Sequence, residues 1–334
     1  MRIVVTGGAG FIGSHLCARL LGEGHEVVCV DNLRTGSALN LATIQGDARF
    51  TWLNRDVSDL AQPLLAMPEL AEGPVDAIFH LASPASPRGY LRMPVETALA
   101  NSQGTYACLE LARAKQARFL LASTSEAYGD PLEHPQRETY WGNVNPIGQR
   151  ACYDESKRFA EALTFVYLRT HGVDARVVRI FNCYGPHSDP EDGRLVPSAV
   201  TRALRGEPIV VYGSGEQTRS LCYVDDLVEG LVRAAWQRDT RGEVFNLGMP
   251  DERSVREIVA LVNRLCGHRS PITFGPPISE DDPQRRCPDI AKARRVLSWE
   301  PGVPLEDGLA RTIAWFARRL DLPLPEASPA EGTR

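Results

Sequence analysis

Short apolar runs alternate with longer amphipathic stretches through the first half of the chain. Six runs have the length and β-branched content of buried strands: residues 3–6, 26–31, 49–53, 77–80, 119–123 and 176–180. Helical periodicity falls between them and is clearest in 94–114 and 151–171. Because strands and helices alternate, the pattern predicts an α/β fold with a parallel, doubly wound sheet and right-handed crossovers.

The alternation loosens in the second half, where proline and glycine become frequent between residues 185 and 193. The pattern there predicts helices at 196–205, 225–237, 255–266, 290–297 and 305–320, and strands at 209–212 and 245–248. We therefore expect a core in residues 1–181 and a smaller, interleaved C-terminal lobe in 182–320, with the chain returning to the core near 224–250. The tail 323–334 is rich in Pro, Glu, Ala and Ser and is predicted to be disordered.

A glycine-rich turn follows the first predicted strand. Gly7, Gly10 and Gly13 give the spacing G-x-x-G-x-x-G, and a helical pattern comes next. Glycines allow the tight turn and let backbone N–H groups approach a pyrophosphate at the helix N-terminus. The second strand ends in Asp31, an acid that accepts the ribose hydroxyls of NAD, while Arg34 nearby leaves NADP open. Together these features predict a Rossmann core that binds NAD, against the alternative of a glycine turn without a ligand.

Tyr153 and Lys157 stand four residues apart in a predicted helix, so both side chains lie on one face. There the ammonium can favour the phenolate and lower the pKa of the tyrosine from its usual value of about 10. Such a tyrosine can act as the general base for an alcohol proton. Alone the pair is weak, because similar pairs occur on many surface helices. The polar run Thr124, Ser125 and Glu126, at the end of the fifth predicted strand, adds to the candidate site.

Composition limits the possible partners. The 334 residues suit a nucleotide-binding core with an added lobe. With 37 basic against 42 acidic residues and no basic block, we expect no nucleic-acid partner. The eight cysteines form no C-x-x-C pair and the seven histidines are scattered, which predicts reduced thiols and no metal site. Met1 leads directly into the first strand and no apolar run is long enough to span a membrane, so we expect a cytoplasmic protein without a membrane partner.

Longer segments resemble the extended short-chain dehydrogenase/reductase family, which acts on nucleotide sugars, over about residues 1 to 320. The segments that carry the resemblance are 80–87, 122–131, 140–148, 152–155, 213–219, 286–290 and 299–301. Within the family they are most similar to the UDP-glucuronate decarboxylases. Sugar 4-epimerases usually lack a glutamate at the position of Glu126, and 4,6-dehydratases usually have Asp-Glu in place of Ser125-Glu126. His187 and Cys287 stand where the relatives usually have an arginine and a lysine.

The resemblance implies a reaction and a set of catalytic residues. UDP-glucuronate is the favoured substrate, and NAD is reduced and re-oxidised in place while UDP-xylose forms through a 4-keto intermediate. The implied catalytic residues are Tyr153, Lys157, Thr124, Ser125, Glu126 and Arg286. Thr124 would hydrogen-bond O4 of the sugar, and Ser125 would contact O4 or the carboxylate. Glu126 would steer that carboxylate or activate water for protonation of C5, and Arg286 would engage the carboxylate region.

Binding residues are carried over in the same way. The implied cofactor-binding residues are Gly7, Gly10, Phe11, Ile12, Gly13, Asp31, Asn32, Asp56, Val57, Leu81, Ala82, Tyr153 and Lys157. The implied substrate-binding residues are Pro84, Asn182, Arg194, Tyr212, Arg219, Tyr223 and Arg286. Arg194 and Arg219 suit a diphosphate, which takes planar bidentate donors well. Tyr212 and Tyr223 either line the nucleotide pocket or pack in the core.

The resemblance further implies a homodimer, because helices 94–114 and 151–171 pair across a two-fold axis in the relatives. Three other functions stay open at this point. A UDP-uronate 4-epimerase or related keto-sugar enzyme would retain the carboxyl group. An alcohol dehydrogenase would release its reduced cofactor. A regulator would bind NAD without turnover, although such proteins often lose the Tyr-x-x-x-Lys pair.

Overall fold

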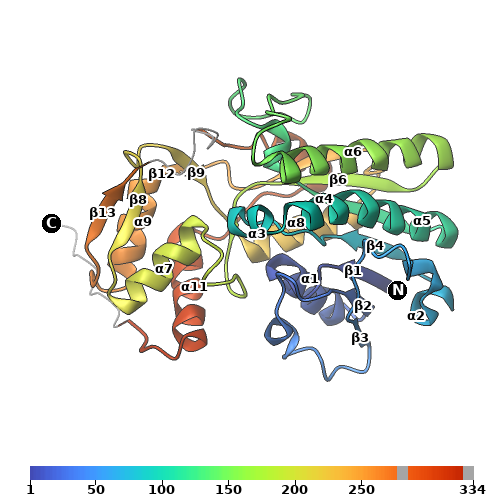
Figure 1. Cartoon of the computed structure of the whole chain (residues 1–334), viewed down its shortest axis with the longest axis horizontal. Coiled ribbons are helices and arrows are strands. Elements are labelled where there is room, and N and C mark those ends of the chain that lie inside the picture. The colour runs from blue at the N-terminus through green and yellow to red at the C-terminus, as the bar shows by residue number, and fades with distance from the viewer. Residues whose placement is uncertain (277–284, 326–334) are drawn as a thin grey trace.

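A seven-stranded parallel sheet forms the centre of the computed structural model, which describes residues 1–276 and 285–325 (Figure 1). The strand order is β11-β6-β5-β4-β1-β2-β3. The strands are β1 (Arg2–Thr6), β2 (Glu26–Val30), β3 (Phe50–Leu53), β4 (Ala77–His80), β5 (Arg118–Thr124), β6 (Ala175–Ile180) and β11 (Val244–Leu247). The six strands predicted in the first half are confirmed, and so is the doubly wound class. The order reverses between β1 and β4, which is where such sheets bind ligands at their carboxyl edge.

Helices cover both faces of this sheet (Figure 1). One face carries α1 (Phe11–Gly22) and α8 (Val224–Trp236), and the other carries α4 (Pro94–Leu99), α5 (Thr105–Lys115) and α6 (Ala151–His171). Side chains of β1 alternate between the two sides: Ile3 and Val5 pack in the first core cluster and Val4 in the second. Burial on both faces explains why the strands are mainly apolar.

The predicted helix 94–114 is divided by a π-helical turn, η3 (Ala100–Gly104). Asn101 is fully buried at this turn and its amide donates to Ser156 Oγ at 2.9 Å. A β-carbon at Gly104 would lie 2.7 Å from Val57 Cγ2, so the helix approaches the neighbouring loop closely here. The prediction of one continuous helix is therefore wrong in detail, because buried polar and steric contacts widen one turn.

A smaller lobe, at the left of Figure 1, packs beside the carboxyl edge of the sheet. It contains α7 (Leu195–Arg205), α9 (Val255–Leu265) and α11 (Leu305–Arg319), with paired strands β8 (Ile209–Tyr212) and β13 (Ile272–Gly275), and β9 (Thr218–Ser220) and β12 (Glu252–Ser254). The remaining elements are η1 (Ala38–Leu41), η2 (Leu64–Ala66), α2 (Pro68–Ala71), α3 (Pro87–Arg92), η4 (Ser125–Tyr128), β7 (Cys183–Tyr184), β10 (Cys222–Tyr223) and α10 (Ala291–Leu297).

The second half of the chain contributes to both the central sheet and the smaller lobe. β11 pairs with β6 in parallel, and α8 packs against the sheet. One apolar cluster runs from β1 through α8 into α7 and α9, so the lobe shares its core with one face of the sheet. The division at residue 181 stays a prediction, and residues 326–334 of the predicted disordered tail lie outside the described residues. Among the described helices, none is long and apolar enough to cross a membrane.

Candidate active site

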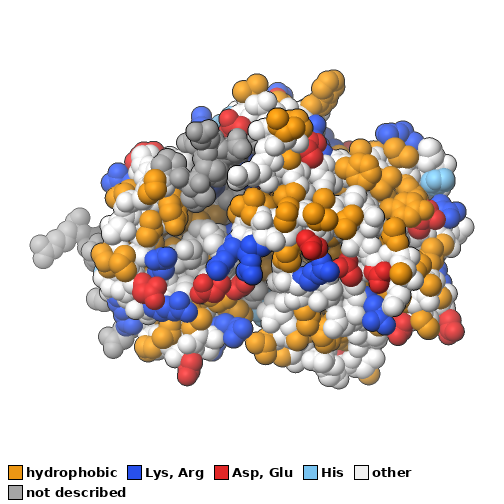
Figure 2. Space-filling model, viewed as in Figure 1, with side chains coloured by type: hydrophobic (Ala, Val, Ile, Leu, Met, Phe, Trp, Pro, Cys, Tyr) orange, Lys and Arg blue, Asp and Glu red, His pale blue; other side chains and the backbone are white. Residues whose placement is uncertain are grey.

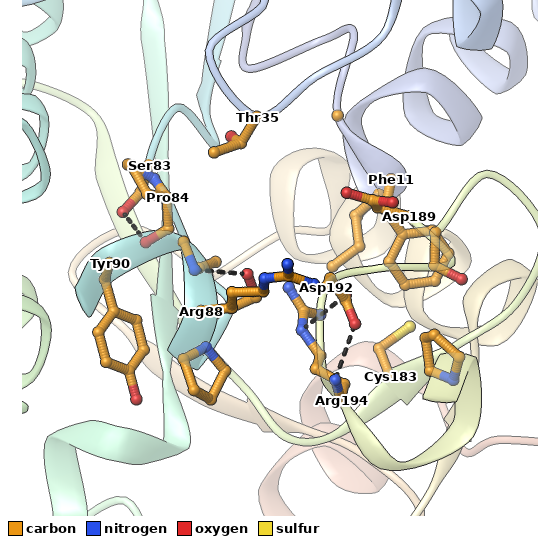
Figure 3. A pocket seen from close by; sticks show the side chains of 18 of the residues that line it. Phe11, Thr35, Ser83, Pro84, Arg88, Tyr90, Cys183, Asp189, Asp192 and Arg194 are labelled. Carbon is orange, nitrogen blue, oxygen red and sulfur yellow. Dashed lines mark hydrogen bonds and ion pairs between the residues drawn. The ribbon is translucent and has the colours of Figure 1, made fainter. Parts of the chain in front are cut away.

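A cavity of about 920 Å³ lies between the carboxyl edge of the sheet and the lobe (Figure 3). Its walls come from the loops after β1, β2, β4 and β5, from α6, and from the lobe. Of the residues predicted to bind cofactor or substrate or to act in catalysis, all but Tyr223 line it. Tyr223 is buried against Tyr184, with ring centroids 5.6 Å apart, so it packs in the core instead.

The glycine turn forms one end of the cavity. Gly7 has φ +73°, and a β-carbon there would lie 2.7 Å from the backbone nitrogen of Ala82. A β-carbon at Gly13 would lie 2.1 Å from the carbonyl oxygen of Gly7. No other residue type fits this path without moving the backbone. The turn leads into α1, which begins at Phe11, so the helix N-terminus faces the cavity and suits a pyrophosphate.

Asp31 ends the wall formed by β2. Its two carboxylate oxygens accept backbone N–H groups at 2.8 and 2.9 Å, while burial raises its pKa. Asp56 accepts the side-chain amide of Asn32 at 3.0 Å, and Arg34 lies 3.6 Å from the same carboxylate oxygen. Arg34 is thus already paired with an acid. These residues fit a dinucleotide whose ribose hydroxyls would donate to Asp31.

Tyr153 and Lys157 lie buried on α6 in the middle of the cavity wall. Lys157 Nζ donates to the carbonyl oxygen of Ala122 at 2.8 Å and lies 6.0 Å from the centroid of the Tyr153 ring. Burial raises the pKa of Tyr153 to about 12, although a hydrogen bond with Thr124 opposes the rise. Burial lowers the pKa of Lys157 to about 8. The expected lowering of the tyrosine pKa is therefore wrong for the protein chain alone, because desolvation outweighs the hydrogen bond with Thr124 and the charge of Arg194.

Glu126 is held by two arginines beside this pair. Its carboxylate accepts hydrogen bonds from Arg150 and from Arg286, whose Nη2 lies 3.0 Å from Oε2. Burial would raise the pKa of Glu126, but the two guanidinium groups outweigh it and hold the pKa at about 2. The glutamate is therefore ionised, and two cations surround one anion. We call Glu126, Arg150 and Arg286 the arginine clamp.

Arg150 is a site residue that sequence reasoning missed. It lies directly before α6, three residues ahead of Tyr153, and that spacing of one helical turn was the available signal. Its Nε lies 3.8 Å from Asp154 Oδ2. The pKa of Asp154 is raised to about 7, first by burial and then by the charge of Glu126. A carboxyl that titrates near neutral pH therefore lies next to the arginine clamp.

The lobe side of the cavity carries further cations. Figure 3 shows Asp192 and Arg194 pointing toward one another, and Arg194 Nε lies 3.3 Å from Asp192 Oδ2. Arg88, on α3, reaches across the cavity and donates to the carbonyl oxygen of Glu191 at 2.6 Å. Arg219 and Tyr212 complete this wall. Arg88 was also missed, because nothing in its local sequence shows that α3 faces the lobe.

Three comparisons place this geometry among known proteins. The family model described as the NAD dependent epimerase/dehydratase family matches residues 3–248. UDP-glucuronic acid decarboxylase 1 of Danio rerio is 48% identical, with 98% of this chain and 77% of that protein covered. The Arabidopsis thaliana enzyme of the same name is 50% identical, over 96% of this chain and 71% of that protein.

Solved structures with this fold bind NAD and nucleotide sugars. UDP-glucose 4-epimerase from Thermotoga maritima, with UDP-glucose, superposes with a TM-score of 0.86 at 32% identity over 96% of this chain and all (100%) of that one. UDP-glucuronic acid 4-epimerase from Bacillus cereus, with UDP-glucuronic acid and NAD, gives 0.84 at 27% identity over 96% and 100% of the two chains. On the strength of the family match, the relatives and the glycine turn, this chain belongs to the NAD-dependent epimerase/dehydratase family.

Proposed function

We propose that the protein is a UDP-glucuronate decarboxylase that forms UDP-xylose and CO2. The arginine clamp is the observation that carries this proposal. Two guanidinium groups around one ionised glutamate leave an excess positive charge beside Tyr153. A sugar whose C5 bears a carboxylate would place that negative group there when its 4-hydroxyl meets the tyrosine. The 48% and 50% identity to curated decarboxylases agrees with this substrate.

Oxidation at C4 begins with the proton of the sugar 4-hydroxyl, which passes to the Tyr153 phenolate oxygen. Bound NAD+ would supply the hydride acceptor for C4 and a positive charge that favours the phenolate. Lys157, fixed by the Ala122 carbonyl, lies 6.0 Å from the centroid of the Tyr153 ring. Thr124, which is hydrogen-bonded to Tyr153, is placed to contact the same sugar oxygen. Because Tyr153 is buried, its phenolate is not stabilised by water and depends on these groups.

Decarboxylation then follows from the chemistry of the 4-keto sugar. Its C5 carboxylate lies β to the new carbonyl, so the C5–C6 bond can break with release of CO2. The electron pair enters an enolate whose oxygen remains hydrogen-bonded to Tyr153 and Thr124. Arg150 and Arg286 would hold the carboxylate until it leaves, after which C5 takes a proton and C4 takes back a hydride from the reduced cofactor, which restores the 4-hydroxyl. Glu126 would orient the water that delivers this proton, and Ser125 would contact O4 or the carboxylate.

The rest of the nucleotide sugar would lie along the lobe. Arg194 and Arg219 are assigned to the diphosphate, and Arg88 provides a third cation on the opposite wall. Asn182 and Pro84 also line the cavity and are assigned to the sugar side of the diphosphate. Tyr212, which is 43% exposed, lies at the rim and is assigned to the nucleotide base.

The test is a product analysis. Purified protein is incubated with UDP-glucuronate and catalytic NAD, and CO2, the sugar product and NADH are followed together. UDP-xylose with equimolar CO2 and no net NADH is the expected result. UDP-galacturonate without CO2 would instead establish a 4-epimerase, the alternative favoured by the similarity to the Bacillus cereus structure. A 4-keto-pentose with stoichiometric NADH would show that the hydride is not returned.

We propose that the protein is a homodimer. Large apolar side chains are exposed on the helices of one face: Val95, Leu99, Tyr106, Phe159 and Val166. They lie on α4, α5 and α6, which pack against one another, and Figure 2 shows apolar side chains gathered over these helices. A four-helix interface between two copies would cover them. Light scattering should give the mass of a dimer for the native chain and of a monomer for Phe159→Glu.

We propose a cytoplasmic location. All eight cysteines are free thiols, as expected for a reducing compartment. Cell fractionation with an antibody against the native chain would test this, and recovery in a membrane or secreted fraction would contradict it.

A further inference from the structure

Three potential metal ligands from distant parts of the chain meet behind the arginine clamp. His134 follows β5, Glu252 begins β12, and Cys287 precedes α10. Their ligand atoms all lie within 4.8 Å of one another, and His134 Nε2 is 2.8 Å from Glu252 Oε2. A tetrahedral zinc ion holds its ligand atoms about 3–4 Å apart, so small side-chain rotations would close this arrangement around an ion.

The surrounding structure already holds two of the ligands in place. Thr218 Oγ1 donates to Glu252 Oε1 at 2.6 Å, which leaves Oε2 directed at His134. Gln136 Oε1 accepts the backbone N–H of Cys287 at 2.9 Å. Hydrogen bonds of this kind, made to the atoms that do not bind the metal, orient ligands in known metal sites.

An ion could reach the cluster from solvent. The side chains of His134 and Glu252 are 24% and 19% exposed, whereas the thiol of Cys287 lies buried beneath them. Arg285 Nη2 lies 3.7 Å from Glu252 Oε2, but its side chain is 63% exposed and can move into water when a cation takes its place.

We propose that His134, Glu252 and Cys287 form a binding site for a thiophilic divalent cation of the Zn²⁺ class, with water as the fourth ligand. Imidazole, thiolate and carboxylate are the ligands that this ion takes, and the thiolate disfavours Mg²⁺ and Ca²⁺. On binding, the S–H bond of Cys287 breaks, a sulfur–metal bond forms and the proton leaves to solvent. Because the thiol must lose its proton to bind the ion, the affinity rises with pH.

The proposed metal site takes no part in the proposed reaction, but one of its ligands is next in the chain to a residue of the arginine clamp. Cys287 follows Arg286, the arginine that donates to Glu126 and to the carbonyl oxygen of Gly129. A cation bound to Cys287 would therefore restrain the backbone from which Arg286 reaches the clamp. The sequence predicted no metal site because it has no C-x-x-C pair and its histidines are scattered. The proposed ligands could not be recognised in it, because 118 residues separate His134 from Glu252.

Cobalt(II) provides the direct test, because thiolate ligation gives it an intense near-ultraviolet charge-transfer band. Untagged protein is titrated with Co²⁺ and then with Zn²⁺, and bound metal is counted by elemental analysis. We expect the band to saturate at one Co²⁺ per chain and to disappear on addition of one equivalent of Zn²⁺. Cys287→Ser should remove the band, and His134→Ala should weaken Co²⁺ binding at least about tenfold.

Cys152→Ser is the matched control, because Cys152 is a more accessible thiol away from the cluster. The Co²⁺ charge-transfer band should persist in this variant. Glu252→Gln retains a side-chain oxygen that can accept the hydrogen bond from Thr218, and it should weaken Co²⁺ binding. It becomes the test variant if circular dichroism shows that Cys287→Ser does not fold. A wild-type protein without the band would overturn the proposal. So would a band that survives in Cys287→Ser or is lost in Cys152→Ser.

Discussion

The two ends of the cavity are built in opposite ways. The cofactor end consists of a glycine turn after β1 and Asp31 after β2, which act through backbone shape and backbone N–H groups. The carboxylate end is the arginine clamp, in which Arg150 is 24 and Arg286 is 160 residues from Glu126. One end depends on local conformation, and the other on charges that only folding brings together. The first suits a ligand shared by the family, and the second a group specific to one substrate.

The largest expected effect falls on the residue between the two ends. Tyr153→Phe removes the proton acceptor and should lower kcat by about 10²–10⁴-fold, the usual contribution of a general base. NAD content and UDP-glucuronate affinity should change little, since neither end of the cavity is altered. Steady-state kinetics and equilibrium binding check this. Turnover at the native rate would remove Tyr153 from the mechanism.

Breaking the arginine clamp should cost stability as well as activity. Arg286→Met leaves Glu126, whose side chain is 17% exposed, with one guanidinium partner, and the free energy of unfolding should fall by about 3 kcal/mol. Arg285→Met is the matched control, because that side chain is 63% exposed, and it should change the value by less than about 0.5 kcal/mol. Urea denaturation of both variants measures the difference. Equal losses of unfolding free energy in the two variants would mean that the arginine clamp does not stabilise this end of the cavity.

The cofactor end should respond to a single methyl group. Gly13→Ala places a β-carbon 2.1 Å from the Gly7 carbonyl oxygen and should weaken NAD binding at least about tenfold, as the turn shifts away from the pyrophosphate. Gly22→Ala, at the other end of α1, meets no atom within 4 Å and should stabilise the protein by about 0.4–1 kcal/mol. Calorimetric titration with NAD compares them. Unchanged NAD affinity in Gly13→Ala would contradict the proposed pyrophosphate site.

A pH dependence is expected at the carboxylate end. Burial and Glu126 raise the pKa of Asp154 to about 7, above its unfolded value near 4, so the folded state binds the extra proton between these pH values. Its contribution to stability is therefore present at low pH and is lost as pH rises through about 7. Asp154→Asn should remove up to about 1.4 kcal/mol per pH unit from the slope of the unfolding free energy between pH 5 and 7. Denaturation at several pH values measures this slope, and a slope equal to that of the native chain would exclude Asp154 as its source.

The residues that could be predicted without the family resemblance share one property: their signal is local. Gly7, Gly10 and Gly13 stand between a strand and a helix, and Tyr153 and Lys157 share a helix face. The six strands could be placed because a strand buried on both faces needs a continuous apolar run. Glu126 and Arg286 could be named through the family resemblance, and the structure places them in contact.

Other features depended on how distant segments pack. Arg150 and Arg88 enter the cavity because α6 and α3 border it, whereas Tyr223 turns into the core although its sequence surroundings resemble those of Tyr212. Burial raises the pKa of Tyr153 where helix spacing alone predicted a lowering, since spacing carries no information on desolvation.

The sequence by itself determined the doubly wound core, the cofactor turn and the catalytic pair, because backbone conformation and helix spacing follow from neighbouring residues. The tertiary structure alone decided the arginine clamp, the titration of Asp154 and the meeting of His134, Glu252 and Cys287. These depend on charge, burial and ligand distance between separate segments, which are 118 residues apart for His134 and Glu252 and 160 for Glu126 and Arg286. Electrostatic and metal-binding properties arise from such distances in space, which no local pattern encodes.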